Sequence, residues 1–277
     1  MMKAIHQLIQ KFENNSIDTP FAIFIKELSV FTIKQFLSCV FPAFIFMMLL
    51  FSKIVPLGFL PRYDFLLISC ICMQWLMFKY KLETSSELLV ITMFHLLGLS
   101  LEIFKVYKGS WSYNEFSYTK ILNVPLYSGF MYASVGSYVC QAWRWFNLKV
   151  KNWPPSWQTI IISALIYFNF FTHHYFFDFR WLITVLLLLV FWNTMVTFNT
   201  NGQIRKMPIV LAYLLIGFFI WLAENMATFL GAWKYASQHD GWKMVDLGKI
   251  SSWFLLIVLS IVIVTQLKIL KYGVENK

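Results

Sequence analysis

The sequence predicts an all-α integral membrane protein with about eight transmembrane helices, arranged as two parallel four-helix repeats. Three observations predict this class. Hydrophobic residues make up 59% of the chain and charged residues only 13%, whereas soluble domains carry about 25% charged residues. Apolar runs of roughly 20 residues, the length that crosses a bilayer core about 30 Å thick, recur along the chain. A polar phrase at the end of the third run returns 122 residues later, at the end of the seventh.

Eight apolar segments are bounded by turn or charged residues and are candidates for transmembrane helices. They cover about residues 36–55, 64–79, 88–106, 125–146, 157–177, 181–199, 208–229 and 251–270. Only Asp178-Phe-Arg180 separates the fifth from the sixth, which predicts a tight hairpin. Residues 1–35 mix charged residues with Ile5, Leu8, Ile9 and Phe12 at helical spacing. We therefore expect a cytoplasmic amphipathic segment before the first span.

The repeated phrase predicts a duplicated unit. Residues 102–113 and 224–235 contain Glu, Gly, Trp and Tyr at identical spacing. The first copy has Glu102, Gly109, Trp111 and Tyr113, and the second has Glu224, Gly231, Trp233 and Tyr235. A shift of 122 maps segments one to four onto five to eight, and an even number of spans gives both units one orientation. Residues 36–146 and 157–270 are therefore predicted to form two parallel repeats.

The charge distribution predicts membrane anchoring and an orientation. The net charge is +10, but the basic residues form no single face, so we expect no binding to nucleic acid. They lie between the apolar runs, as membrane anchors do. With the N-terminus inside, 14 of the 23 Lys and Arg residues fall on the inner side and nine on the outer side. The positive-inside rule therefore favours cytoplasmic N- and C-termini.

Glu102 and Glu224 are the first candidates for catalytic residues. A carboxyl group at the end of a transmembrane helix is costly unless it faces a polar cavity or a partner. Two such groups in one site can supply a general acid. Each Glu could equally be structural and pin its own loop by accepting hydrogen bonds from the Trp or Tyr. The aromatic residues of the two phrases are candidate binding residues: Trp111, Tyr113, Trp233 and Tyr235.

A second candidate cluster, the run from His173 and His174 to Asp178, has no counterpart in the first half. These three residues could relay protons or bind a metal. The spacing matches no zinc motif, however, and Asp178 could simply pair with Arg180 across the turn. The sequence thus leaves any metal or cofactor unknown.

Further candidate binding residues lie near the same membrane level. His95 precedes Glu102 by seven residues and shares its helical face. An intramembrane His, however, is as often a hydrogen-bonded residue between helices as a functional one. Ser128, Lys249 and Ser251 lie where the fourth and eighth segments re-enter the membrane. Because segments three, five and seven run outward, we expect His95, both Glu residues, His173 or His174, and Asp178 to line one cleft at the outer face.

Several phrases carry a resemblance to a known family. They are Leu101-Glu-Ile-Phe-Lys with Gly109-Ser-Trp-Ser-Tyr113, Val124-Pro-Leu-Tyr-Ser-Gly-Phe-Met-Tyr132, Thr172 to Trp181, Ala223-Glu-Asn through Tyr235, and Lys249-Ile-Ser-Ser-Trp253. Together they resemble the YoaT-like family of bacterial integral membrane proteins of unknown function. The resemblance covers most of the chain beyond residue 36 and implies a multi-span protein of the bacterial inner membrane.

A second, weaker resemblance concerns Glu-x6-Gly followed by aromatic residues and a helix opened by Pro. It is similar to a phrase of membrane carotenoid hydratases and cyclases, which act on isoprenoid double bonds with acidic residues. This chain departs from that pattern, since Trp replaces the usual Phe-Gly pair and no Pro-Glu-Glu occurs.

These observations favour a membrane enzyme that acts on a lipid or isoprenoid by general acid–base chemistry near the outer face. The abundance of aromatic residues suits a cationic intermediate, and the expected partners are membrane lipids and a hydrophobic small-molecule substrate. A small-molecule transporter is the first alternative, although transporter sites usually lie near the midplane at interrupted helices. A non-enzymatic membrane binding protein is the second.

Overall fold

The protein is mostly helical in the computed structural model, which describes residue 7 and residues 19–272, with side chains as far as residue 268. The helices are α2 (Pro20–Ser38), α3 (Val40–Ile54), α4 (Arg62–Lys79), α5 (Ser85–Tyr107), α6 (Tyr127–Trp145), α7 (Ser156–Thr172), α8 (Arg180–Val190), α9 (Ile209–Phe229) and α10 (Lys249–Tyr272), with a 3₁₀ turn at Ala236–Gln238. The expected amphipathic residues Ile5, Leu8, Ile9 and Phe12 lie outside the described residues.

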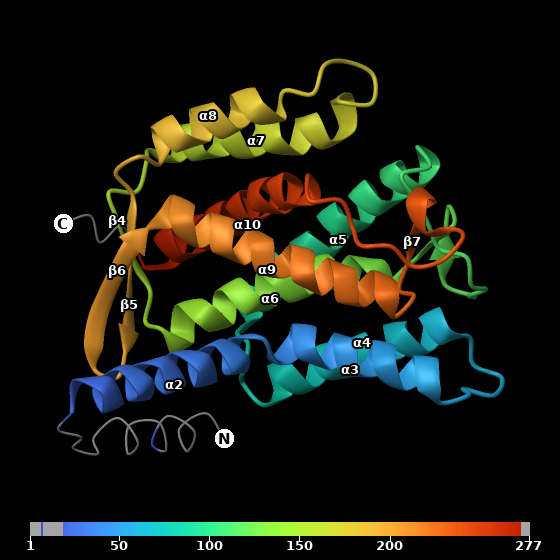
Figure 1. Cartoon of the computed structure of the whole chain (residues 1–277), viewed down its shortest axis with the longest axis horizontal. Coiled ribbons are helices and arrows are strands. Elements are labelled where there is room, and N and C mark those ends of the chain that lie inside the picture. Colours follow the sequence, from blue (N-terminus) through green and yellow to red (C-terminus); the bar gives the residue numbers. More distant parts are fainter. Residues whose placement is uncertain (1–6, 8–18, 273–277) are drawn as a thin grey trace.

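The helices form three layers (Figure 1). In the middle layer α5 packs along α6 and α9 packs along α10, which also contacts α6 and α7. The α7–α8 hairpin lies on one side of this layer, and α2, α3 and α4 lie on the other. The middle layer therefore carries the ends of both α5 and α9, where the repeated phrases begin.

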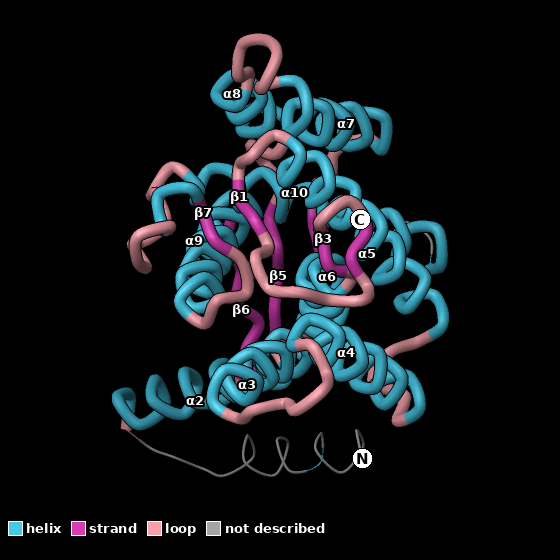
Figure 2. The backbone as a smooth tube through the Cα atoms, turned by 90° about the vertical axis from the view of Figure 1, so that its right-hand side faces the viewer, coloured by secondary structure: helices cyan, strands magenta, loops and turns pink. Residues whose placement is uncertain are grey.

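Short strands close both ends of the helical body (Figures 1 and 2). At one end β4 (Lys149–Lys151), β5 (Met195–Thr200) and β6 (Gln203–Pro208) form an antiparallel sheet in that order. At the other end β1 (Trp111–Ser112) pairs with β7 (Lys234–Tyr235), and β2 (Lys120–Ile121) pairs with β3 (Val124–Pro125). The β1–β7 pair joins the loops that follow α5 and α9, and it is the end that carries the candidate site.

Three of the described helices are long and apolar enough to cross a membrane: Ser85–Tyr107, Ile209–Phe229 and Lys249–Lys268. A fourth span results if α2 and α3, which meet at 67°, count as one broken helix. The bend falls at Cys39, three residues before Pro42. Because Pro has no N–H and its ring collides with the preceding turn, a helix that runs into it breaks or kinks.

The segment expected at 181–199 is shorter in the structure than the sequence predicts. Helix α8 ends at Val190, and the chain then forms the β5–β6 hairpin. The hairpin turns at Asn201 and Gly202, which have φ values of +50° and +71°. Asn-Gly is a strong signal for a two-residue hairpin turn, and the alternating Met195–Thr200 run that precedes it suits a strand. Apolar content alone predicts a helix across this turn signal, and the structure corrects that helix to one that ends at Val190.

The outer faces of several helices expose large apolar side chains. Leu89, Leu96, Phe168, Leu189 and Phe219 are each at least 60% exposed. Soluble monomers rarely present apolar surface over several neighbouring helices. Together with the length and composition of α5, α9 and α10, this exposure fits association with a membrane.

Candidate functional site

The two repeated phrases end their helices in the same way. Gly109 and Gly231 follow α5 and α9 with φ values of +70° and +78°. The amide of Ser110 donates to the carbonyl of Lys105 at 2.9 Å, and the amide of Ala232 donates to Ala227 at the same distance. Glycine takes this left-handed conformation without strain and is the usual residue one position past a helix end. Each chain therefore turns sharply back over the last turn of its own helix.

The two returning loops pair with each other. Strands β1 and β7 run antiparallel, with Trp111 opposite Tyr235 and Ser112 opposite Lys234. The rings of Trp111 and Tyr235 meet edge to face, 5.8 Å apart. The pairing brings the ends of α5 and α9 to one place, although they are far apart in the sequence.

Glu102 is buried to 3% exposure beneath this pair. Its Oε2 accepts hydrogen bonds from the Trp111 indole and the Tyr113 hydroxyl, both at 2.7 Å. Its Oε1 accepts one from the Tyr132 hydroxyl of α6 at 2.8 Å. Burial and the neighbouring Glu102 carboxylate raise the pKa of Tyr113 well above 10, so this hydroxyl stays a donor. Three neutral donors from two elements thus fix the carboxyl group.

Glu224 is equally buried, at 4% exposure, but has two donors. The Tyr235 hydroxyl donates to Oε1 at 2.5 Å, and the Trp253 indole of α10 donates to Oε2 at 2.8 Å. Both Glu residues are therefore buried and accept hydrogen bonds from an aromatic hydroxyl and an indole. The contacts fit a pinning role and leave a chemical role open, because a carboxylate has about four acceptor positions.

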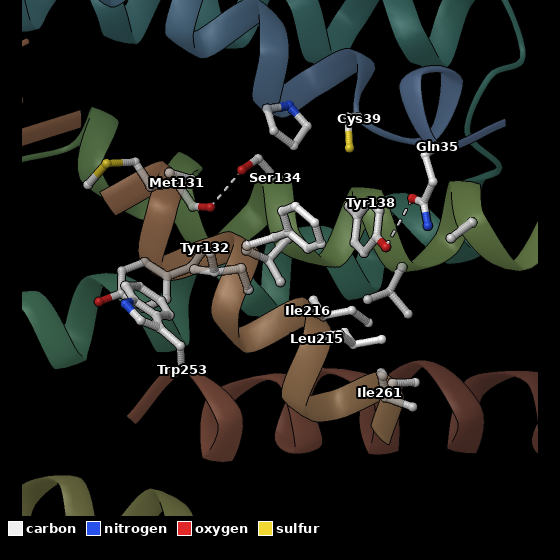
Figure 3. A pocket seen from close by; sticks show the side chains of 18 of the residues that line it. Gln35, Cys39, Met131, Tyr132, Ser134, Tyr138, Leu215, Ile216, Trp253 and Ile261 are labelled. Atoms are coloured by element: carbon white, nitrogen blue, oxygen red, sulfur yellow. Dashed lines mark hydrogen bonds between the residues drawn. The ribbon is translucent and has the colours of Figure 1, made fainter. Parts of the chain in front are cut away.

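An elongated apolar cavity of about 690 Å³ has both carboxyl groups in its lining. Its walls come from α2, α3, α6, α9 and the β4–β6 sheet, with contributions from the two paired loops and α10. In Figure 3, Trp253 and Tyr132 lie at one end, while Gln35 and Cys39 lie at the other. At the far end, the Tyr138 hydroxyl donates to Oε1 of Gln35 at 3.3 Å. The acids thus lie at one end of a long, almost wholly apolar space.

Lys249 covers the acidic end. Its ammonium lies over the rings of Trp111 and Tyr235, 5.4 and 4.8 Å from their centres. It also attracts Glu224 and, more weakly, Glu102 electrostatically. Of the residues proposed from the sequence, the two Glu residues, Trp111, Tyr113, Tyr235 and Lys249 therefore form one group. Trp233 lines the same cavity.

His173 and His174 belong to a neighbouring cluster built on Lys105, one turn beyond Glu102. The Lys105 ammonium lies 3.2 Å from Nε2 of His173 and 2.8 Å from Nε2 of His174. Burial and the nearby Lys105 charge lower the pKa of His174 to about 4. Burial also lowers the pKa of His173, although a hydrogen bond with the Asn169 carbonyl opposes this. Both imidazoles are therefore neutral acceptors near pH 7.

Asp178 holds the α7–α8 turn in place. Its carboxylate accepts from the Asn169 amide at 3.0 Å and pairs with Arg180 at 3.2 Å. Burial would raise the pKa of Asp178, but the hydrogen bonds from Asn169 and the Arg180 backbone lower it below its usual value. Arg180 also donates to the hydroxyl of Ser251 at 2.9 Å, which ties the turn to α10. These contacts support the expected pairing of Asp178 with Arg180.

The single cleft expected from the sequence is divided in the structure. His173, His174 and Asp178 do not line the apolar cavity, and neither does His95. The His95 ring packs on Phe130, 4.5 Å between centres, and its Nδ1 is buried without a hydrogen-bond partner. The hydroxyl of Ser128 is likewise buried and unpartnered. Sharing a helical face with Glu102 did not bring His95 into the cavity, because α6 packs over that part of α5.

Three contact residues were missed as site residues from the sequence: Tyr132, Trp253 and Lys105. Tyr132 and Trp253 approach from the helices that follow the phrases, and a short motif does not reveal such long-range contacts. Lys105 could have been found, because it lies three residues after Glu102 on a neighbouring helical position. Among the described residues, no group of three or more His, Cys, Asp and Glu side chains could hold a metal ion.

Comparison with known proteins places the chain in a family. A family model described as "Protein of unknown function (DUF817)" matches residues 27–261. The chain is 56% identical to "Uncharacterized protein YoaT" of Bacillus subtilis (strain 168) over 247 residues, which is 89% of this chain and 94% of that protein. No solved structure matches. The resemblance seen in the phrases is confirmed: the chain belongs to the DUF817 family, whose members are described as proteins of unknown function.

Proposed function

We propose that this protein is a multi-pass membrane enzyme that transfers protons to and from a hydrophobic lipid or isoprenoid. The observation that carries the proposal is the apolar cavity with two buried carboxyl groups at one end. Its volume of about 690 Å³ lies within the range of about 300–1,000 Å³ common for small-molecule sites. An almost wholly apolar wall with a few convergent polar groups selects an apolar molecule and orients it by one end.

The surroundings of the acids suit chemistry at a carbon–carbon double bond. A protonated Glu gives its proton to one carbon, which leaves a carboxylate on the protein and a cation on the other carbon. The second carboxylate then takes a proton from an adjacent carbon or from an adding water, so that charge and protons balance. The rings of Trp111, Tyr132 and Trp253 lie beside the acids, and aromatic faces attract cations. General acid–base help of this kind contributes about 10²–10⁴ in rate.

The two-unit organisation is part of this proposal. A shift of 122 residues maps Tyr107, the last residue of α5, onto Phe229, the last residue of α9. The same shift maps the first residue of α6 onto the first residue of α10. The hydrogen bonds after Gly109 and Gly231 correspond under the same shift. So do the Tyr113–Glu102 and Tyr235–Glu224 contacts. These correspondences support a duplication that includes at least the second helix pair of each unit.

We also propose eight passes through the bacterial inner membrane, with both termini in the cytoplasm. The bias of basic residues supports this orientation. Reporter fusions after residues 58, 115, 177 and 240 should report the outer side, and fusions after residues 82, 152 and 202 the inner side. A reversed pattern would contradict the orientation.

Untargeted lipid profiling of a deletion strain against its parent tests the enzyme proposal. We expect one lipid or isoprenoid to accumulate and another to disappear in the deletion strain, and wild-type protein to reverse both changes. A non-enzymatic binding protein would change the amount of a species without a paired substrate and product. Unchanged profiles under all growth conditions tested would contradict the proposal.

A further inference from the structure

A basic cluster lies beside the acidic site, at the same end of the molecule. It consists of Lys105 and Lys108 at the end of α5, with His173 and His174 from the α7–α8 turn. The Lys105 side chain is buried to 7% exposure. It donates to two imidazoles, and the Nδ1 of His173 lies 2.8 Å from the Asn169 carbonyl. Since Nδ1 can only donate to that carbonyl, Nε2 of a neutral His173 is an acceptor for the ammonium.

The buried ammonium has no counter-ion in the described part of the chain. The ion pairs there involve other groups, and no carboxylate lies within 4.0 Å of Lys105. Asp178, the carboxylate of the adjoining turn, is already engaged by Asn169 and Arg180. A cation withdrawn from water with only neutral partners is destabilising. The fold nevertheless places this one near two more cations, Lys249 and Arg180.

The ammonium groups of Lys108 and Lys249 lie over aromatic rings, and neither forms an ion pair with a carboxylate among the described residues. The Lys108 ammonium lies 3.8 Å from the ring centre of Tyr175, and Lys249 lies over Trp111 and Tyr235. Rings attract cations without neutralising them. Lys108 and Lys249 therefore keep their positive charge beside Lys105, and this charge is available to an external anion.

The same turn presents apolar side chains outward. Tyr175 and Trp181 are 60% and 71% exposed, and Phe176 and Phe177, which lie between them in the sequence, are 73% and 84% exposed. Tyr and Trp at helix ends favour the lipid headgroup level, where phosphate groups lie. This observation is independent of the charges, and it supports a position of the cluster near phospholipid phosphates.

We propose that Lys105, Lys108, His173 and His174 form a binding site for a phosphate group, supplied by the headgroup of an anionic phospholipid at the membrane surface. The phosphate oxygens accept hydrogen bonds from the two ammonium groups and from Nδ1–H of His174, because the Nε2 of that ring accepts from Lys105. His173 positions Lys105 from the other side. The exposed Phe176 and Phe177 insert among the acyl chains beside it. This site does not depend on the proposed reaction, because it lies outside the apolar cavity and holds no residue of that cavity.

The test measures lipid binding by the purified full-length protein in a zwitterionic detergent. Phosphatidylglycerol and phosphatidylcholine are added separately, and bound lipid is counted by native mass spectrometry. We expect wild-type protein to bind phosphatidylglycerol about tenfold more tightly than phosphatidylcholine. Lys105→Gln should lose about tenfold or more of this affinity, because it removes a charged donor. Lys108→Gln should lose about fivefold, which is the usual effect of one basic residue near an anionic surface.

Two comparisons make the result decisive. Lys79→Gln removes a Lys held over the Trp75 ring at the far end of α4, and it should bind as wild type does. If Lys105→Gln does not fold, Lys108→Gln carries the test, because Lys108 is only partly buried. Thermal unfolding with added inorganic phosphate or glycerol phosphate distinguishes a free phosphate from a lipid headgroup as the ligand. Stabilisation by either small anion shows a site for free phosphate. Stabilisation by phosphatidylglycerol alone shows a lipid site. Equal binding of both lipids, or variants that bind like wild type, would overturn the proposal.

Discussion

Glu102 and Glu224 hold the same position in two similar phrases, yet their surroundings differ. Glu102 accepts from three neutral donors, whereas Glu224 accepts from two and has the Lys249 ammonium nearby. In the first copy, both Trp111 and Tyr113 of the loop that follows α5 donate hydrogen bonds to Glu102. In the second copy the corresponding Trp233 gives no such bond to Glu224, and Trp253 of α10 donates instead. A shared backbone thus supports two different electrostatic environments.

The helices that follow the phrases account for part of this difference. Helix α6 begins at Tyr127 and α10 begins at Lys249, positions related by the same shift of 122. The Tyr127 hydroxyl donates to the Ala232 carbonyl at 2.6 Å and so holds the second loop. Lys249 instead brings a positive charge over the paired aromatic rings. In one copy this position therefore holds the opposite loop in place, whereas in the other it supplies positive charge to the site.

The largest expected effect is a loss of activity when either cavity acid, but not a carboxylate outside the cavity, loses its ionisable group. Glu102→Gln and Glu224→Gln keep size and most hydrogen bonding but remove the ionisable group. Under the enzyme proposal each should accumulate normally and lose about 10²–10⁴ in rate, so that the lipid change of the deletion strain persists. Glu115→Gln is the control, because Glu115 pairs with Arg62 outside this cavity. Full restoration of the parental profile by either cavity variant would assign that Glu a structural role.

The next effect concerns two glycines that support the donors. A Cβ at Gly98 would lie 2.3 Å from Cγ of Tyr132, and one at Gly217 would lie 2.9 Å from the Phe254 backbone nitrogen, next to Trp253. We expect Gly98→Ala and Gly217→Ala each to lower the free energy of unfolding by about 1–3 kcal/mol through overpacking. Thermal unfolding in detergent measures this. Leu96→Ala, on the exposed face of α5, should change stability by about 0.5 kcal/mol or less. Alanine variants as stable as wild type would mean that the helices can separate without cost.

A smaller effect compares the two Trp residues of the phrases. In a double-mutant cycle, Trp111→Phe and Glu102→Gln should show a coupling free energy of about 1.5 kcal/mol, because the indole donates to the carboxylate. Trp233→Phe and Glu224→Gln should be additive within about 0.5 kcal/mol. Equal coupling in the two cycles would show that the copies are equivalent in solution.

The features of the two acid sites that the sequence could predict are those set by residues close in the chain. The repeated phrases predicted the two Glu residues, their need for a polar partner, and the ends of the third and seventh apolar runs, because these features depend on neighbours within about ten residues. The partners from α6 and α10 depend on how helices pack, so Tyr132 and Trp253 were not singled out. Hydropathy likewise found the apolar segment after Arg180 but not the β5–β6 hairpin, whose signal lies in Asn201-Gly202. For His95 the sequence indicated the correct helical face, but it did not reveal that a neighbouring helix covers this side chain.

The smallest effect concerns the pair of His residues, which the first half lacks. Because folding lowers the pKa of both His173 and His174, the unfolded chain binds protons more readily than the folded protein. Stability from the neutral imidazoles is therefore complete above the unfolded pKa of about 6.5 and is lost as the pH falls from there towards about 4. The groups that face the pair are Lys105, Lys108, Lys249, Arg180 and Asp178.

We compare the fall in Tm between pH 7.5 and pH 5 in wild type and in a His173→Gln/His174→Gln variant. Because the His174 ring is largely solvated, we expect the fall in wild type to exceed that in the variant by only about 2–4 °C. The measurement is thermal unfolding in a zwitterionic detergent without phosphate or anionic lipid. The difference between wild type and the double variant isolates the His pair from the carboxylates that also titrate in this range. Identical pH dependence of the two proteins would show that Lys105 holds the turn without the imidazoles. Phosphatidylglycerol should shrink or reverse the fall, because an anion beside the cluster favours the protonated rings.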